Sequence, residues 1–281
     1  MTLKLLIFIA FLGCSVTSAQ VLVPTKEKRK ALYELGVGAA IFELPDYPGS
    51  EQSRIRTLGL PYGIYRGRTF RADQENGMRG NFFSRSRWDL DLSFGAAFPA
   101  NSERNRARDG MPDLDWIGRV GPRLIYYVIP KGERDRLDLR LPLQATISTD
   151  FGRVDGRGFV FNPSLVYNYN GIFTGRFTLS ASVGAAFATR ALMDYFYQVS
   201  DDFVTPSRPG YSPEAGLLET RYRVGAFWRI SSDVILAASY GVNSYEGATN
   251  RASPLLTQTW TRTAVLGFIW RVFSSEERAY Y

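Results

Sequence analysis

The sequence contains no histidine and only one cysteine among its 281 residues. Without histidine, the chain cannot form a His-ligated metal site, a Ser-His-Asp triad or a Cys-His pair. A single cysteine excludes an internal disulfide framework. The sequence also contains no Gly-x-Ser-x-Gly motif and no glycine-rich phosphate loop before a predicted helix. We therefore expect no catalytic residues, no cofactor and no metal site, and a protein that is not an enzyme.

Long hydrophobic runs are also missing, except at the N-terminus. A membrane-spanning helix needs about 20 apolar residues, and residues 1–19 come closest. They combine a basic start at Lys4, a short apolar run from Leu5 to Gly13, and a small-residue end at Ala19. This pattern is typical of a secretory signal peptide that is cut after Ala19.

Two alternatives exist for this segment, a buried N-terminal helix and lipoprotein processing at Cys14. Removal of residues 1–19 leaves a chain without cysteine, so its stability must come from backbone hydrogen bonds and packing. We expect residues 20–30 to form a short N-terminal segment and residues 31–281 to form a single domain.

The chain is rich in residues that favour strands and turns, with 19 Phe, 16 Tyr and 26 Gly. Its dominant hydrophobic period is two. Between Trp88 and Phe98, apolar side chains alternate with polar or small ones, and residues 137–148 and 218–230 follow the same rule. These patterns predict an all-β protein.

The length of the alternating runs indicates which kind of sheet they form. They extend over roughly 9–15 residues, whereas strands average about 5–6 residues in soluble domains and a tilted membrane-crossing strand needs about 9–11. A membrane sheet must close, because hydrocarbon leaves no partner for an open edge. We therefore predict a closed antiparallel transmembrane β-barrel. The alternative is a soluble sandwich or lipocalin-like barrel, in which the apolar faces point inward.

The pattern predicts about twelve strands, with ten as the alternative, and bacterial barrels have even strand numbers. The candidate strands are 31–42, 54–66, 68–84, 87–98, 115–129, 136–149, 157–170, 174–188, 192–199, 217–230, 234–246 and 260–273. We expect residues 31–281 to form the outer-membrane β-barrel and residues 20–30 to form an N-terminal periplasmic segment. With both termini in the periplasm, 43–53, 200–216 and 247–259 become long outer loops. The stretch 99–114 is also long, yet this count places it on the periplasmic side. Either a strand is miscounted or the stretch is an element of the inner face.

Charged residues occupy the polar faces of many predicted strands. An arginine that faces lipid at the membrane centre would cost about 2–4 kcal/mol, so these side chains should face the lumen. Two interpretations are open, a charge network that fills a narrow barrel and a passage that favours anions. The charges are spread singly, which argues against nucleic-acid binding. The candidate lumen charges are Arg119, Arg123, Arg140, Arg221, Arg223, Arg229, Asp89, Asp91, Asp138 and Glu219.

Several sequence blocks resemble one protein family. They are residues 47–51 (Tyr-Pro-Gly-Ser-Glu), 58–62, 121–123, 195–200, 209–216 and 270–273. Together they resemble the MipA/OmpV family, the MltA-interacting protein family of Gram-negative outer-membrane proteins, over essentially the whole mature chain. One departure is the tail after Phe273, because outer-membrane proteins usually end on an aromatic strand residue.

This resemblance implies a closed barrel in the outer membrane of a Gram-negative bacterium. The member that names the family is a scaffold for a lytic transglycosylase and a murein synthase, and other members are described as porin-like proteins or adhesins. The implied partners are outer-membrane lipid and murein-processing enzymes.

The most specific of these blocks contains Tyr47, Pro48, Gly49 and Ser50. Proline presets φ and glycine accepts a positive φ, so the block is interpreted as a structural turn in an outer loop rather than a contact site. The leading functional hypothesis is a non-enzymatic structural or scaffolding barrel linked to murein-enzyme assembly. The alternative is a passive porin-like channel for small, anionic solutes.

Overall fold

The computed structural model describes residues 31–66, 70–73, 77–80, 83–84, 87–130, 134–172 and 176–277. The expected signal peptide, residues 1–19, and the segment 20–30 lie outside the described residues. None of the helices within these ranges is long and apolar enough to cross a bilayer. The strands are β1 (Tyr33–Pro45), β2 (Ser53–Arg66), β3 (Phe70–Asp73), β4 (Gly77–Gly80), β5 (Phe83–Ser84), β6 (Trp88–Ala97), β7 (Trp116–Tyr127), β8 (Asp135–Thr149), β9 (Val154–Phe161), β10 (Ser164–Ile172), β11 (Phe177–Ala188), β12 (Gly216–Arg229), β13 (Val234–Ser244) and β14 (Trp260–Ser274). The helices are η1 (Ser102–Arg104), η2 (Arg106–Arg108), α2 (Arg190–Tyr197) and η4 (Asp201–Phe203).

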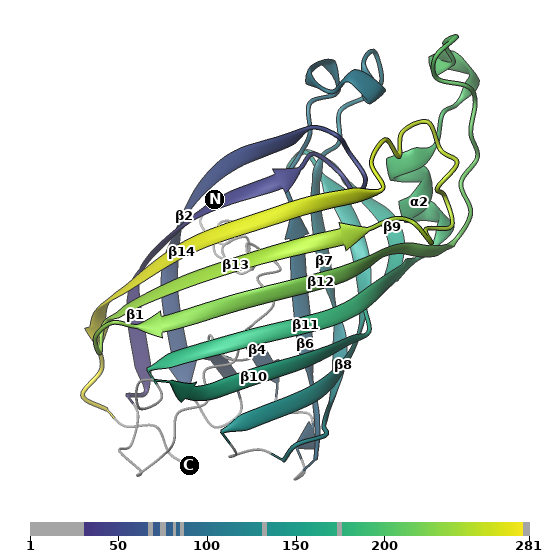
Figure 1. The fold of residues 1–281 in the computed structure, drawn as a ribbon. Helices are drawn as coiled ribbons and strands as arrows, with labels where there is room; N and C mark the ends of the chain where they lie inside the picture. Colours follow the sequence, from purple (N-terminus) through teal and green to yellow (C-terminus); the bar gives the residue numbers. More distant parts are fainter. Residues whose placement is uncertain are drawn as a thin grey trace.

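All of the described strands belong to one antiparallel sheet that curls into a barrel (Figure 1). The first and last long strands are paired, β1 with β14. The sheet path ends at β4 and β5, which follow each other in the chain, and β4 lies against β6, so the circuit closes at this end. The strands β9 and β10 lie end to end between β8 and β11 and occupy one position in the sheet. The strands β4 and β5 together occupy one position between β3 and β6. Counted in this way, the described strands make a sheet of twelve strands.

The prediction of about twelve strands is confirmed, although two of the predicted strands are wrong. The segment 68–84 is not one strand, because β3 and β4 pair with each other as a hairpin. The segment 192–199 is not a strand, because residues 190–197 form the helix α2. The two errors cancel in the total.

The β3–β4 hairpin also explains why the strand count placed the stretch 99–114 at the wrong end of the barrel. The extra strand of this hairpin reverses the predicted direction of the strands from β6 to β11, and the absence of a strand at 192–199 restores it from β12 onward. The connection between β6 and β7 therefore lies at the same end as the β1–β2 and β13–β14 connections (Figure 1). The predicted periplasmic position of 99–114 is therefore wrong. We call this end the loop end, and the opposite end, with the short β12–β13 connection at Ser231–Asp233, the turn end.

The barrel is polar inside and apolar outside, which strand β8 illustrates. Its polar side chains Arg136, Asp138 and Arg140 are buried, whereas the leucines between them are partly exposed and Leu143 is 48% exposed. A soluble sheet buries the apolar face instead. Exposure of a continuous apolar wall is stable only against lipid, so the sheet crosses a membrane.

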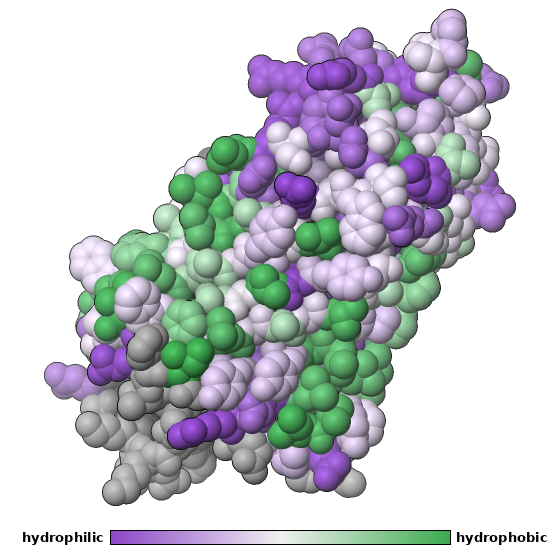
Figure 2. Space-filling model, in the orientation of Figure 1, coloured by the Kyte–Doolittle hydropathy of each residue, from purple (hydrophilic) through white to green (hydrophobic). Residues whose placement is uncertain are grey.

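Aromatic side chains border this wall at both ends. Trp260 at the loop end and Trp270 at the turn end of β14 are both exposed. Ten residues at about 3.3 Å each, tilted by about 40°, span roughly 25 Å, the height of the apolar band of outer-membrane barrels. Figure 2 shows hydrophobic side chains over the strands and hydrophilic side chains at the loop end.

Candidate functional site

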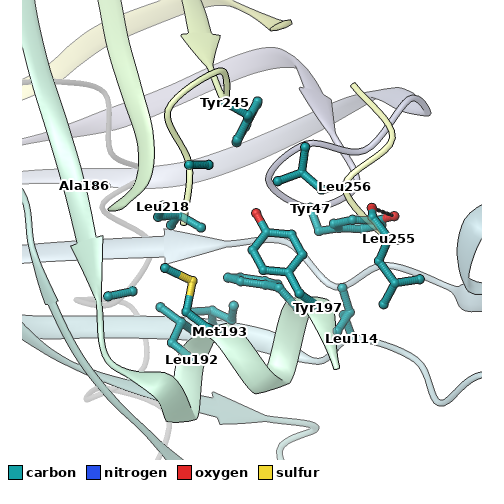
Figure 3. Packing of buried hydrophobic residues seen from close by; sticks show 14 of the residues in the cluster. Tyr47, Leu114, Ala186, Leu192, Met193, Tyr197, Leu218, Tyr245, Leu255 and Leu256 are labelled. Atoms are coloured by element: carbon teal, nitrogen blue, oxygen red, sulfur yellow. Dashed lines mark hydrogen bonds between the residues drawn. The ribbon is translucent and has the colours of Figure 1, made fainter. Parts of the chain in front are cut away.

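Four long connections fold over the loop end and form a cap. They are residues 46–52, 98–115, 189–215 and 245–259, and they come together from four different hairpins (Figure 1). The cap has its own hydrophobic core, beside the inward-facing strand ends (Figure 3). Its buried members are Tyr47, Ala100, Leu114, Ile117, Val160, Ala186, Ala188, Leu192, Met193, Phe196, Tyr197, Val199, Leu218, Tyr245, Ala248, Leu255 and Leu256. Burial of each large side chain contributes about 1.5–3 kcal/mol, so the cap is a packed structure rather than a set of open loops.

The helix α2 supplies the centre of this core. Leu192, Met193, Phe196 and Tyr197 are spaced so that they share one face, and all four are buried. An isolated helix of eight residues is marginal in water. Packing against the other cap segments therefore stabilises α2.

The Tyr47–Ser50 motif lies within the cap as a tight turn. The Ser50 amide donates a hydrogen bond to the Tyr47 carbonyl at 3.0 Å, and Gly49 has φ +80°. Pro48 at the second position and a positive φ at the third define a type II turn. Tyr47 and Ser50 are both buried.

Hydrogen bonds interlock this turn with two other cap segments. The Tyr47 hydroxyl donates to the Leu255 carbonyl at 2.8 Å, and the Tyr197 hydroxyl donates to the Pro48 carbonyl at 3.0 Å. Ser253 Oγ donates to the Tyr197 carbonyl at 3.0 Å. Each bond joins segments that are far apart in the sequence, so the cap segments are held as one unit.

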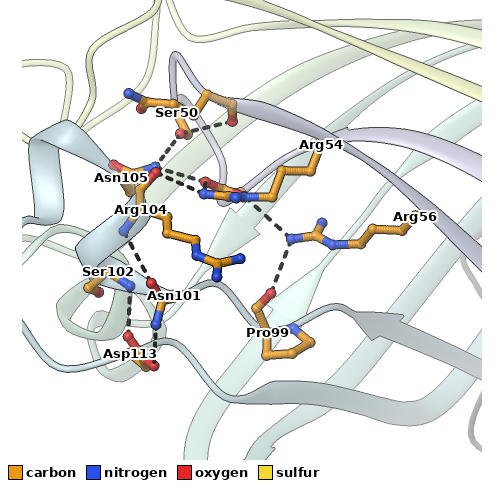
Figure 4. A network of polar contacts seen from close by, with 11 residues as sticks. Ser50, Arg54, Arg56, Pro99, Asn101, Ser102, Arg104, Asn105 and Asp113 are labelled. Carbon is orange, nitrogen blue, oxygen red and sulfur yellow. Dashed lines mark hydrogen bonds and ion pairs between the residues drawn. The ribbon is translucent and has the colours of Figure 1, made fainter.

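A buried carboxylate, Asp46, ties the cap to the barrel wall (Figure 4). Arg54 donates to it through Nε at 2.7 Å and Nη2 at 3.2 Å, Arg56 Nη2 lies at 3.4 Å, and Asn105 Nδ2 donates at 3.1 Å. Both arginines also reach the 98–115 segment, where Arg54 donates to the Arg104 carbonyl and Arg56 to the Pro99 carbonyl. These side chains link β2 to the β6–β7 connection.

Arg108 shows what the basic stretch 99–114 does. Its guanidinium is buried and donates to the carbonyls of Phe196 at 3.3 Å and Pro112 at 3.0 Å. Burial lowers the pKa of Arg108, although Tyr47 lies close enough to oppose this shift. Arg104 and Arg106 are exposed, so one of the three arginines in this stretch is a structural anchor of the cap.

The cap tyrosines are held in their neutral form. Burial raises the pKa of Tyr47 to about 12, against a partial opposing effect of Arg108. Burial also raises the pKa of Tyr197 and Tyr245 well above the ordinary value. A neutral phenol keeps its proton available for the hydrogen bonds that close the cap.

The structure brings several of the candidate lumen charges together. Arg123 Nη2 lies 2.7 Å from Asp91 Oδ2, and Arg140 Nε lies 2.7 Å from Asp138 Oδ2. Arg136, which the sequence analysis did not single out, also contacts Asp138 at 3.2 Å.

The remaining lumen candidates have separate positions. Arg221 Nε lies 2.6 Å from Glu219 Oε1 near the loop end, and Asp89 accepts a hydrogen bond from the Tyr127 hydroxyl at 2.7 Å. The other three, all partly buried, are Arg119 and Arg223, which line a cavity beneath the cap, and Arg229, which lies at the turn end of β12.

The family profile described as MltA-interacting protein MipA matches residues 36–272, which include every long strand of the barrel. The chain belongs to the MipA family. A search of curated proteins finds no significant match.

Solved structures give three distant likenesses. The chain is similar to one described as a bacterial polysaccharide outer membrane secretin, with 8% identity over 87% of this chain and 99% of that chain and a TM-score of 0.42. OprB of Pseudomonas putida has 8% identity over 86% and 94%, with a TM-score of 0.39. OprG of Pseudomonas aeruginosa has 10% identity over 88% and 98%, with a TM-score of 0.23.

Membership in the MipA family and the lipid-facing barrel place the protein in the outer membrane of a Gram-negative bacterium. Such barrels carry short turns on the periplasmic side and longer loops outside. On this rule, we expect the turn end of this MipA-family barrel to be periplasmic and the cap to face the outside of the cell.

Apart from the Tyr47–Ser50 turn, the cap core is what the sequence analysis missed. Leu192, Met193, Phe196 and Tyr197 lie at helical spacing, which could have identified α2. The contact of Asp46 with Asn105 carries no local signal, because the two residues are far apart in the sequence.

Proposed function

We propose that this protein is a non-enzymatic scaffold of the outer membrane, which presents its periplasmic face to murein-processing enzymes. The barrel anchors the protein in the membrane, and the cap blocks the direct route through its outer mouth. The family name, MltA-interacting protein, supports an enzyme partner of this class. The observation that carries the proposal is the packed cap core, because a channel would need an open mouth.

The β12–β13 turn and the adjoining start of β1 offer a surface for such a partner. Arg271 on β14 contacts Asp233 at 2.8 Å and Glu34 at 3.1 Å, and it donates to the Ser232 carbonyl at 2.6 Å. These contacts hold the β12–β13 turn against the start of β1. The preformed surface reduces the ordering cost of binding.

Site-specific crosslinking in intact cells tests this proposal. A photoreactive residue is placed at Ser232 in the periplasmic turn, and a matched one at Val204 in the cap. We expect murein-processing enzymes to be captured from position 232 and not from position 204. Failure to capture them from position 232, with the barrel folded as judged by heat-modifiable gel mobility, would remove the scaffolding role.

The second candidate is a passive channel for small anions, favoured by arginines that line the cavity beneath the cap, such as Arg119 and Arg223. Planar bilayers separate the two functions. The scaffold predicts a silent barrel, whereas sustained conductance with anion preference would establish the channel.

A further inference from the structure

A cavity of about 200 Å³ lies in the lumen directly beneath the cap. Its roof is formed by the Tyr47 turn and by Leu192 and Phe196 of α2, and its walls by β1, β2, β6, β7 and β11 to β14. A single water needs about 10–15 Å³, and drug-sized ligands occupy about 300–1,000 Å³. The cavity therefore fits a small molecule of monosaccharide size.

Positive charge predominates around this cavity. Four arginines, Arg56, Arg119, Arg221 and Arg223, line it together with three carboxylates, of Asp46, Asp115 and Glu219. The Asp46 carboxylate forms ion pairs with Arg56 of the lining and with Arg54, which lies outside the lining. Glu219 is bound by Arg221 and by the Tyr245 hydroxyl at 2.7 Å. The arginines in the lining outnumber the carboxylates by one, and low-dielectric walls strengthen the resulting positive field.

Hydroxyl and amide groups form a second feature of the wall. Ser180, Ser239 and Thr263 face the cavity from β11, β13 and β14. Asn243 is buried in the same wall, and its Oδ1 has no hydrogen-bond partner among the described residues. A buried amide oxygen without a donor costs about 1–3 kcal/mol, so a bound hydroxyl group would stabilise it.

We propose that this cavity binds a small polyhydroxylated anion, a monosaccharide that carries a carboxylate or a phosphate. Arg119 and Arg223 attract the anionic group, and Asn243 accepts a hydrogen bond from a hydroxyl of the ligand. Phe98 and Phe227 line the same space and offer apolar faces to the sugar ring. The site does not depend on the scaffolding role, because no residue of the turn end contributes to it.

Calorimetric titration of the full barrel in lipid nanodiscs tests the site. The probes are two anionic sugars, glucuronate and glucose 6-phosphate. Glucose is the neutral analogue and glucosamine the cationic analogue. Inorganic phosphate is an anion that carries no sugar. We expect at least one of the two anionic sugars to bind, and both analogues to bind at least ~10-fold more weakly, because a charge-assisted hydrogen bond is lost. The stronger of the two sugars identifies the anionic group.

Two variants assign the roles of the residues. Arg223→Gln should weaken the anionic sugar by at least ~10-fold, whereas Arg229→Gln, on the same strand and face but outside the cavity, should leave it unchanged. Asn243→Ala should weaken the sugar and leave inorganic phosphate unaffected. Heat-modifiable mobility confirms folding of each variant. Equal binding of all the sugars, preference for glucosamine, no binding by the folded wild type, or equal effects of Arg223→Gln and Arg229→Gln would overturn the proposal.

Discussion

The proposed closure of the lumen by the cap can be tested at Met193. Its side chain is fully buried in the cap core. Replacement of a buried methionine by alanine costs about 2–5 kcal/mol. If the cap opens as one unit, Met193→Ala raises the ratio of open to closed caps by roughly 30- to 4,000-fold, since each 1.4 kcal/mol is a factor of ten.

A single engineered cysteine reports this opening. The only native cysteine, Cys14, lies in the expected signal peptide, so Ser239→Cys in the cavity wall is a unique thiol in the mature chain. A bulky, membrane-impermeant maleimide added outside should label it slowly in the wild-type background and faster by the same factor in Met193→Ala. Val204→Ala, at an exposed cap position, is the control and should leave the rate unchanged. Fast labelling of the wild type, or identical rates with and without Met193→Ala, would show that the cap is not the barrier.

Three further outcomes follow from the same contacts. Asp46→Ala leaves Arg54 and Arg56 facing each other without their carboxylate and should lower the free energy of unfolding by about 2–3 kcal/mol. This loss is smaller than that for breaking a fully buried ion pair, because both arginines are partly exposed. Denaturant titration in vesicles measures the loss, and an unchanged midpoint would contradict it. Leu266→Arg, at the exposed centre of β14, should cost about 2–4 kcal/mol in the same titration, and Leu266→Ile should cost much less. The pKa of Tyr47 is raised from about 10 to about 12, so its contribution to cap stability is complete below pH 10 and is lost as the pH rises from about 10 to 12. Tyr47→Phe should reduce this alkaline loss in maleimide labelling, and an identical pH profile in the variant would refute the assignment.

The lumen charges show which contacts could be predicted from the chain. Arg140 and Asp138 are two residues apart on one strand, so alternation alone places them on the same face, as it does for Arg221 and Glu219. The pair of Arg123 with Asp91 instead depends on the register between β6 and β7, in which these residues lie directly opposite. Register is set by pairing between strands and is not visible in either strand alone.

The segment 192–199 shows where local preference misled the prediction. Its aromatic residues favour a strand, yet the segment forms the end of α2 because a helix places Met193 and Tyr197 together in the cap core. Packing from distant segments outweighed the local propensity, which differs by only about 1 kcal/mol between residue types.

The period-two pattern by itself determined the long strands and which side chains share an apolar face, because side-chain direction along a strand is a local property. It left open whether these apolar faces point outward to lipid or inward to a soluble core. Only the tertiary structure decided at which end of the barrel the stretch 99–114 lies, that residues 190–197 form the helix α2, and that the loop-end connections pack into a cap. The physical reason is that the cap core joins four segments between residues 46 and 259, and the free energy of burying them together belongs to no single segment.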